Sequence, residues 1–175
     1  MTSGTSRLAG SRAGQAATGS PCSAEEFPDT PFEPPSQQGT QAITAIPEKY
    51  LDLLEQKKAF ASLATTMPDG SPQVTPVWFD YKDGIVRVNT AKGRVKVRNL
   101  KPGAAVALAI MDPDNPYRYI QVRGHVRRVT EEGAAAHIDS LAKKYLGQDK
   151  YPFGQPGEVR LTCDIEPMSA SGVGS

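Results

Sequence analysis

A short basic segment is the first candidate for chemistry in this sequence. Residues 89–101 contain no acidic residue and five basic ones, namely Lys92, Arg94, Lys96, Arg98 and Lys101. A short helix is predicted from Gly93 to Leu100, because the Pro-Gly pair at 102–103 ends it. The free N–H groups at the start of that helix and the Thr90 hydroxyl are suited to a phosphate, with Arg94 and Lys96 reinforcing them. The segment therefore predicts an anion-binding site.

The alternative for the same segment is a solvated basic helix face. Lys92 and Lys96 are four residues apart, as are Arg94 and Arg98, so such a face would repel itself unless an anion or solvent screened it. The glycine, the hydroxyl and the helix start next to these charges favour the anion site.

Alternating apolar residues and turn signals place this segment in an antiparallel β-domain. A short helix is expected after Pro47 and a longer one from Glu131 to Leu146. Gly124 is expected to mark a bulge or bend. The hairpin-length links favour a barrel over a doubly wound parallel sheet, with the first three strands as a meander. Six strands are predicted, at residues 60–66, 73–81, 85–89, 104–111, 118–129 and 159–165.

Composition sets the limits of this domain. Residues 1–41 are rich in Gly, Ser, Thr, Ala, Gln and Pro and are expected to be a disordered tail, followed by a folded domain over 42–167 and a flexible end over 168–175. Arg7 and Arg12 leave open a transit peptide, which the Gly and Pro content disfavours. Cys22 and Cys163 match neither a disulfide framework nor a metal site. We expect a cytoplasmic, metal-free protein.

Charge and motifs exclude several classes of function. The chain has 20 Lys and Arg against 19 Asp and Glu, so global charge gives no argument for a nucleic-acid or membrane partner. No Ser/His/Asp arrangement, paired carboxylates or nucleotide fingerprint appears in the folded part. His125 is set aside as a structural or surface residue, and His137 because its helix offers it no partner. Redox chemistry carried by a cofactor remains compatible with this, because the protein then supplies binding and orientation.

Residues 49–165 resemble the pyridoxamine-phosphate-oxidase-like split-barrel superfamily, and within it the deazaflavin (coenzyme F420) dependent reductases of actinobacteria. The resemblance implies a mainly β fold, a six-stranded antiparallel split β-barrel of the FMN-binding type with flanking helices. The order and spacing of four stretches carry it, ASLATT at 61–66, GSPQVTPVWF at 70–79, TAKGRVKVRNL at 90–100 and VRGHV at 122–126.

The resemblance also implies a site. It assigns Thr90, Arg94 and Lys96 to the cofactor phosphate, and Pro76, Val77 and Trp78 to the strand along the ring, with Asn89 beside them. It implies a homodimer with each cofactor between protomers. Trp78 has a simpler reading as core filling. Lys92 and Arg98, with Lys101, suit a cofactor whose tail carries several negative charges.

The resemblance leaves alternatives open. The expected activity is hydride transfer from reduced F420 to an electron-poor small molecule, and no catalytic side chain is assigned. The alternatives are an FMN-dependent oxidoreductase, or a non-catalytic protein that binds flavin, deazaflavin or haem. True pyridoxamine phosphate oxidases carry Trp and Arg in a C-terminal segment, whereas this chain ends in EPMSASGVGS, so vitamin B6 oxidation is not expected.

Overall fold

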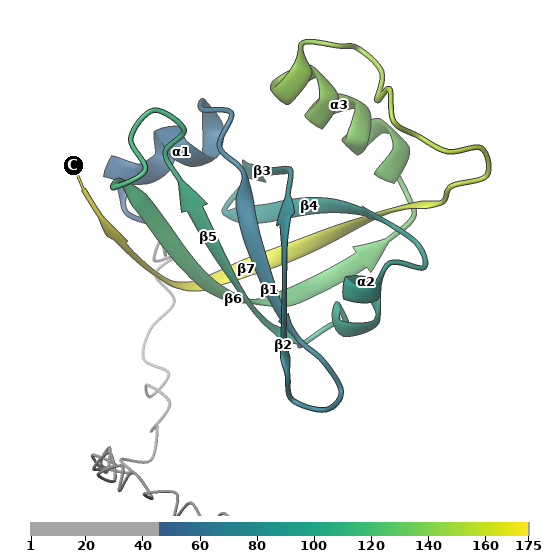
Figure 1. Ribbon diagram of the computed structural model, residues 1–175, viewed down its shortest axis with the longest axis horizontal. Coiled ribbons are helices and arrows are strands. Elements are labelled where there is room, and N and C mark those ends of the chain that lie inside the picture. Colours follow the sequence, from purple (N-terminus) through teal and green to yellow (C-terminus); the bar gives the residue numbers. More distant parts are fainter. Residues whose placement is uncertain (1–45, 175) are drawn as a thin grey trace, which may run out of the picture. The chain divides into compact units, whose positions relative to one another are not determined.

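The computed structural model describes residues 46–174, which form a curled antiparallel sheet with helices around it (Figure 1). A 3-10 turn, η1 (Glu48–Tyr50), leads into α1 (Leu51–Glu55). Within the described range there are two further helices and seven strands: β1 (Ala61–Thr66), β2 (Pro72–Val77), β3 (Phe79–Lys82), β4 (Ile85–Ala91), α2 (Val95–Asn99), β5 (Ala105–Met111), β6 (Tyr119–Thr130), α3 (Ala134–Leu146) and β7 (Arg160–Val173). None of the helices in this part of the chain is long and apolar enough to span a membrane.

The two edge strands of the sheet follow each other in the sequence. The strand order is β2-β1-β5-β6-β7-β4-β3, with all pairs antiparallel. The two edge strands, β2 and β3, are consecutive in sequence and are separated only by Trp78. This junction, hereafter the β2–β3 junction, is where the barrel is split.

The β2–β3 junction corrects two expectations. The single strand predicted at 73–81 is two strands, because residues 72–77 pair with β1 and residues 79–82 pair with β4. The strand count is therefore seven rather than six. The predicted meander is also wrong, since β2 and β3 lie at opposite edges of the sheet.

The long strands β6 and β7 bend together around Gly124. Their register shifts between Arg123 and Gly124, as the predicted bulge requires, and a Cβ at Gly124 would lie 2.2 Å from the Glu166 carbonyl oxygen. The expected flexible end does not hold for residues 168–173. They continue β7 along the first half of β6, where Gly172 packs against the Tyr50 ring. Ser, Ala and Gly make up most of this segment and have low strand propensity, so no strand was predicted there.

Two clusters of apolar side chains hold the fold. The barrel interior contains fully buried side chains from most strands, such as Leu63, Phe79, Leu108 and Ile165. Helix α3 adds a smaller cluster beside the β2–β3 junction, in which Ile138, Leu141 and Tyr145 pack with Trp78 and Tyr151. The helix begins three residues later than predicted, because Gly133 adopts a left-handed conformation immediately before it. The disordered tail predicted at 1–41 lies outside the described residues.

Candidate functional site

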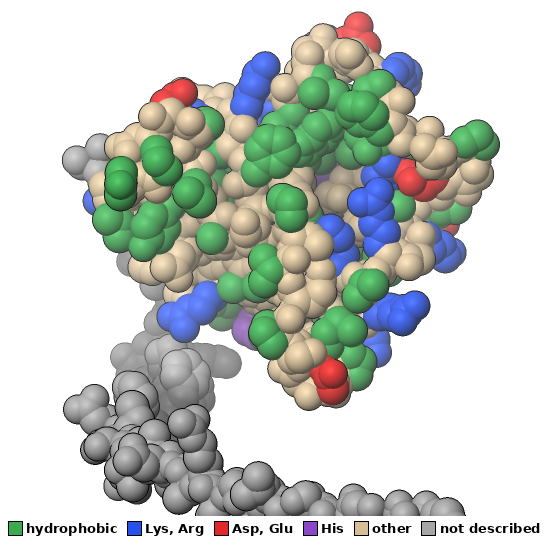
Figure 2. All heavy atoms as spheres, viewed as in Figure 1, with side chains coloured by type: hydrophobic (Ala, Val, Ile, Leu, Met, Phe, Trp, Pro, Cys, Tyr) green, Lys and Arg blue, Asp and Glu red, His purple; other side chains and the backbone are tan. Residues whose placement is uncertain are grey.

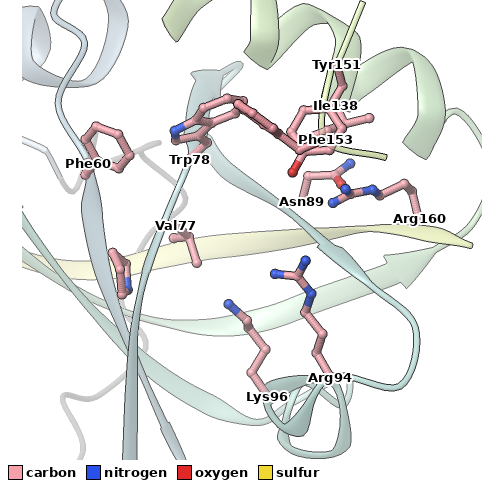
Figure 3. Close-up of a pocket in the computed structure, with 11 residues that line it drawn as sticks. Phe60, Val77, Trp78, Asn89, Arg94, Lys96, Ile138, Tyr151, Phe153 and Arg160 are labelled. Carbon is pink, nitrogen blue, oxygen red and sulfur yellow. The ribbon is translucent and has the colours of Figure 1, made fainter. Parts of the chain in front are cut away.

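A pocket of about 190 Å³ lies at the β2–β3 junction, between α3 and α2 (Figure 3). Its lining comes from segments that are far apart in the sequence. Figure 2 shows hydrophobic side chains gathered on one side of this region and Lys and Arg side chains on the other. Its lining residues are Phe60, Pro76, Val77, Trp78, Asn89, Arg94, Lys96, Ile138, Tyr151, Phe153 and Arg160.

Stacked aromatic rings form one wall of the pocket. The Trp78 ring stacks on Tyr145, with centroids 5.0 Å apart and planes 5° from parallel, and Tyr151 meets Trp78 edge-on at 5.8 Å. The Tyr145 hydroxyl donates a hydrogen bond to the Ala59 carbonyl at 2.8 Å and accepts one from the Phe79 N–H at 3.3 Å. Burial raises the pKa of Tyr145 to about 12, so this hydroxyl stays protonated. The wall is therefore rigid and apolar, and it suits a flat ring.

The opposite side of the pocket is basic. Lys96 is buried, with 7% of its surface exposed, and its Nζ donates to the Thr75 hydroxyl at 2.9 Å. Burial lowers the pKa of Lys96, and the nearby positive charge of Arg94 adds to the effect. An ammonium carries three N–H donors, and no carboxylate is among the residues that line the pocket. A buried cation in this arrangement is stabilised by an anionic ligand.

Arg160 adds a third positive charge at the start of β7. Its guanidinium lies 4.4 Å from the Tyr151 ring centroid, and only 9% of its side chain is exposed. Glu158 Oε1 forms an ion pair with Arg160 Nη2 at 2.5 Å. The ion pair neutralises part of the positive charge at this end of the pocket.

Asn89 provides an uncharged polar group on the side of the pocket next to α3. Its Nδ2 donates to the Ala134 carbonyl at 2.8 Å and lies 3.4 Å from His137 Nδ1. Its Oδ1 is buried without a hydrogen-bond partner in the described part of the chain. An unpartnered buried acceptor is costly, so this atom fits a ligand that offers an N–H or O–H donor.

A buried polar network stands behind Asn89. His137 Nε2 lies 3.3 Å from Asp80 Oδ1, and Arg87 holds the same carboxylate with both of its oxygens engaged. Burial raises the pKa of Asp80, but the hydrogen bonds from His137 and Arg87 outweigh it, so the pKa lies below its ordinary value. Asp80 is therefore an anion at neutral pH. His137, set aside in the sequence as lacking a partner, is thus a buried member of this network.

The structure brings six of the nine predicted site residues into the pocket lining: Pro76, Val77, Trp78, Asn89, Arg94 and Lys96. Three others do not line it. Thr90 is buried within the β4–β7 ladder, and its hydroxyl has no partner among the described residues. Lys92 is exposed and pairs with Glu131 at 2.7 Å, and Arg98 is exposed on α2. Helix α2 begins at Val95 rather than at Gly93, and Lys92 lies in the turn before it.

Five lining residues were not predicted: Phe60, Ile138, Tyr151, Phe153 and Arg160. Ile138 was read as a core residue of its helix. Tyr151 and Phe153 belong to a Pro/Gly-rich loop. Two aromatic residues in such a loop are the feature of the sequence that could have indicated a binding role. Arg160 had none, because only the pairing of β4 with β7 brings it beside the basic segment.

The pocket's chemistry fits a flavin or deazaflavin. The stacked rings match a flat heterocycle, Lys96 and Arg94 match a phosphate, and the unpartnered oxygen of Asn89 matches a ring N–H. The residues of the chain thus supply a surface for the ring, charge for the phosphate and a polar contact for the ring edge.

Comparison with known proteins agrees with this chemistry. The family model described as pyridoxamine 5'-phosphate oxidase matches residues 46–169. A solved F420 reductase is 35% identical with a TM-score of 0.62, and the match covers 72% of this chain and 98% of that one. No curated protein matches the chain.

Two further solved structures share the fold at lower identity. One is a putative pyridoxamine 5'-phosphate oxidase from Listeria innocua, 19% identical with a TM-score of 0.55, covering 73% of this chain and 98% of that one. The other is an FAD and heme binding protein from Mycobacterium smegmatis, 17% identical with a TM-score of 0.54, covering 75% and 72%. The chain therefore belongs to the pyridoxamine 5'-phosphate oxidase-like family of flavin-binding split barrels, in the branch that contains the F420 reductase.

Proposed function

We propose that this protein is an oxidoreductase that binds coenzyme F420 and transfers a hydride from the reduced deazaflavin to an electron-poor small organic molecule. One observation carries the proposal. Lys96 is buried in a pocket whose lining contains no carboxylate, and it lies across that pocket from the stacked rings of Trp78 and Tyr145. The 35% identity to an F420 reductase supports the deazaflavin as the ring.

The chain's own residues have binding and orienting roles in this proposal. Lys96 and Arg94 neutralise the phosphate, and Trp78, fixed by Tyr145, sets the plane of the ring. When bound, reduced F420 supplies the hydride from its C5 position. The lining residues include no carboxylate, imidazole or thiol, so the protein contributes orientation and exclusion of water rather than a dedicated acid or base.

FMN is the second candidate, because the family model that matches the chain is that of a pyridoxamine 5'-phosphate oxidase. The sequence favours F420 because it has more basic residues than one phosphate needs. Fewer of these residues are free than expected, since Lys92 is paired with Glu131. Arg98 and Lys101 remain exposed, and in this proposal they are available to a longer anionic tail. A flat ring with one phosphate would need neither of them.

A titration separates the candidates. The protein is expressed in a host without deazaflavin, and the apoprotein is titrated with F420 and with FMN while ligand fluorescence is followed. We expect a colourless protein that binds F420 at least about tenfold more tightly than FMN. A yellow protein that retains FMN and does not bind F420 would overturn the proposal.

Turnover is then tested with the reduced cofactor. Reduced F420 is mixed with the protein and with activated alkenes, quinones or tetrapyrroles, and the return of the oxidised absorbance is measured. Oxidation that depends on both protein and acceptor supports the enzyme. Tight binding without oxidation by any acceptor would instead indicate a non-catalytic binding protein.

A further inference from the structure

Two residues that line the pocket bring buried polar groups of opposite type. Asn89 Oδ1 is an acceptor without a hydrogen-bond partner in the described part of the chain. Arg160 brings a guanidinium donor, whose Nη2 forms an ion pair with Glu158 Oε1 at 2.5 Å. Asn89 pairs with Thr162 in the β4–β7 ladder, and Ala91 pairs with Arg160. Residues two apart project from the same face of a strand, so Asn89 and Arg160 are diagonal neighbours on one face. Both line the pocket (Figure 3).

Contacts with α3 fix the direction in which the Asn89 amide points. The Ala134 carbonyl can only accept a hydrogen bond, so the Asn89 atom 2.8 Å from it must be the nitrogen. The second N–H of that nitrogen faces His137 Nδ1 at 3.4 Å. With both donors directed toward α3, the carbonyl oxygen of this pocket-lining residue is directed away from α3.

The acceptor character of His137 Nδ1 depends in turn on Asp80. A carboxylate only accepts, so the ring proton of His137 is placed on Nε2, which faces Asp80 at 3.3 Å. Nδ1 is then an acceptor for Asn89 and for the Thr162 hydroxyl, which lies 3.2 Å away. Arg87 holds the Asp80 carboxylate in place from the other side. Arg87, Asp80, His137 and Asn89 thus form one chain of contacts that ends in the pocket.

We propose that the His137–Asp80 pair positions Asn89 so that its carbonyl oxygen, beside the Arg160 guanidinium, recognises an N–H adjacent to a C=O on the bound ring. An amide or imide edge has this arrangement of donor and acceptor. The pyrimidine ring of flavins and deazaflavins carries an imide, with N3–H between two carbonyls, and for the identity of the ring the inference rests on the proposed function. His137 and Asp80 are positioning residues, because they act through Asn89.

The test compares ligands that differ only at ring N3, where methylation replaces the proposed N–H donor with N–CH3. FMN, 8-hydroxy-5-deazaflavin phosphate and their N3-methyl derivatives are titrated into the apoprotein by calorimetry. We expect the N3-methyl derivative of the tighter ring to bind at least about tenfold more weakly than its parent, because the acceptor oxygen loses its donor. In Asn89→Ala the ratio of the two dissociation constants, N3-methyl ligand over parent, should fall to about two or less.

Variants of the positioning residue give the second arm. His137→Leu should reduce the ratio to about threefold or less, whereas His137→Asn keeps an acceptor toward Asn89 and should retain most of it. His125→Leu, a change at an exposed histidine of β6, is the matched control and should leave the ratio unchanged. Thermal melts establish folding, and Asp80→Asn replaces His137→Leu if that variant does not fold.

Each outcome decides the inference. Equal affinity of wild-type protein for parent and N3-methyl ligands overturns the inference and leaves the proposed function intact. Failure of both parent rings to bind overturns the proposed function and this inference with it. A ratio that persists in folded His137→Leu overturns the positioning role of His137, since a merely structural histidine would change stability without changing the ratio.

Discussion

Replacing Lys96 with methionine tests the basic side of the pocket most directly. Methionine keeps the length and the apolar stem of the side chain and removes the charge. In the present structure the Lys96 ammonium has one hydroxyl partner at 2.9 Å and is 7% exposed. A charge-assisted hydrogen bond to a phosphate contributes roughly 1.5–3 kcal/mol. Lys96→Met should therefore raise the Kd of the cofactor by roughly tenfold to 150-fold.

The assay is the fluorescence titration with F420 and FMN, with Lys101→Met as the matched control. Lys101 is exposed beyond the end of α2, so screening by solvent should limit its effect to less than about fivefold. Because the contact is made equally before and during hydride transfer, Lys96→Met should raise the cofactor KM far more than it lowers kcat. A folded Lys96→Met protein that binds both ligands as tightly as wild type would refute the reasoning and show that Lys96 does not contact the cofactor phosphate.

The remaining predictions concern pH, packing, the tail and assembly. Burial lowers the pKa of Lys96 and a bound anion favours its charged form, so affinity should fall as pH rises through that lowered pKa, and Lys96→Met should abolish this pH dependence in titrations. Gly124→Ala should reduce the free energy of unfolding by about 1–3 kcal/mol or more in urea melts, because its Cβ would collide with the Glu166 carbonyl; an unchanged midpoint contradicts this. Removing residues before Ala42 should leave Tm and cofactor affinity unchanged, and a loss of either would give the tail a structural role. Sedimentation at micromolar concentration with cofactor should show a homodimer, in which a second copy covers the pocket and exposed side chains such as Phe60 and Phe153; a monomer would count against it.

Local signals in the sequence predicted most of the elements. The Asp69-Gly70 and Asp83-Gly84 turns require residues that tolerate positive φ, and the structure has Gly70 at 84°, Asp83 at 53° and Gly84 at 79°. Both turns close hairpins where they were predicted. These features depend on a few neighbouring residues, so the sequence is sufficient to identify them.

Long-range pairing is what the sequence could not supply. His137 lies 57 residues from Asp80, and Arg160 reaches the pocket only through the pairing of β7 with β4. Lys92 was assigned to an anion because its own segment has no acidic residue, whereas Glu131 approaches from 39 residues away. Each error concerns a partner that the fold, and not the local pattern, brings close.

The β2–β3 junction explains why the site lies where it does. At Trp78 the chain passes from one edge of the sheet to the other, so the two edges are joined by the backbone there and not by a ladder of hydrogen bonds. Tyr145 bridges this opening by bonding to Ala59, which precedes β1, and to Phe79, the first residue of β3. The Tyr145 ring also stacks on Trp78, with the two ring centroids 5.0 Å apart, and so fixes the plane of Trp78 in the pocket wall. The side chain that fastens the split barrel is therefore also the support for the ring-binding wall, and a change at Tyr145 would act on fold and site together.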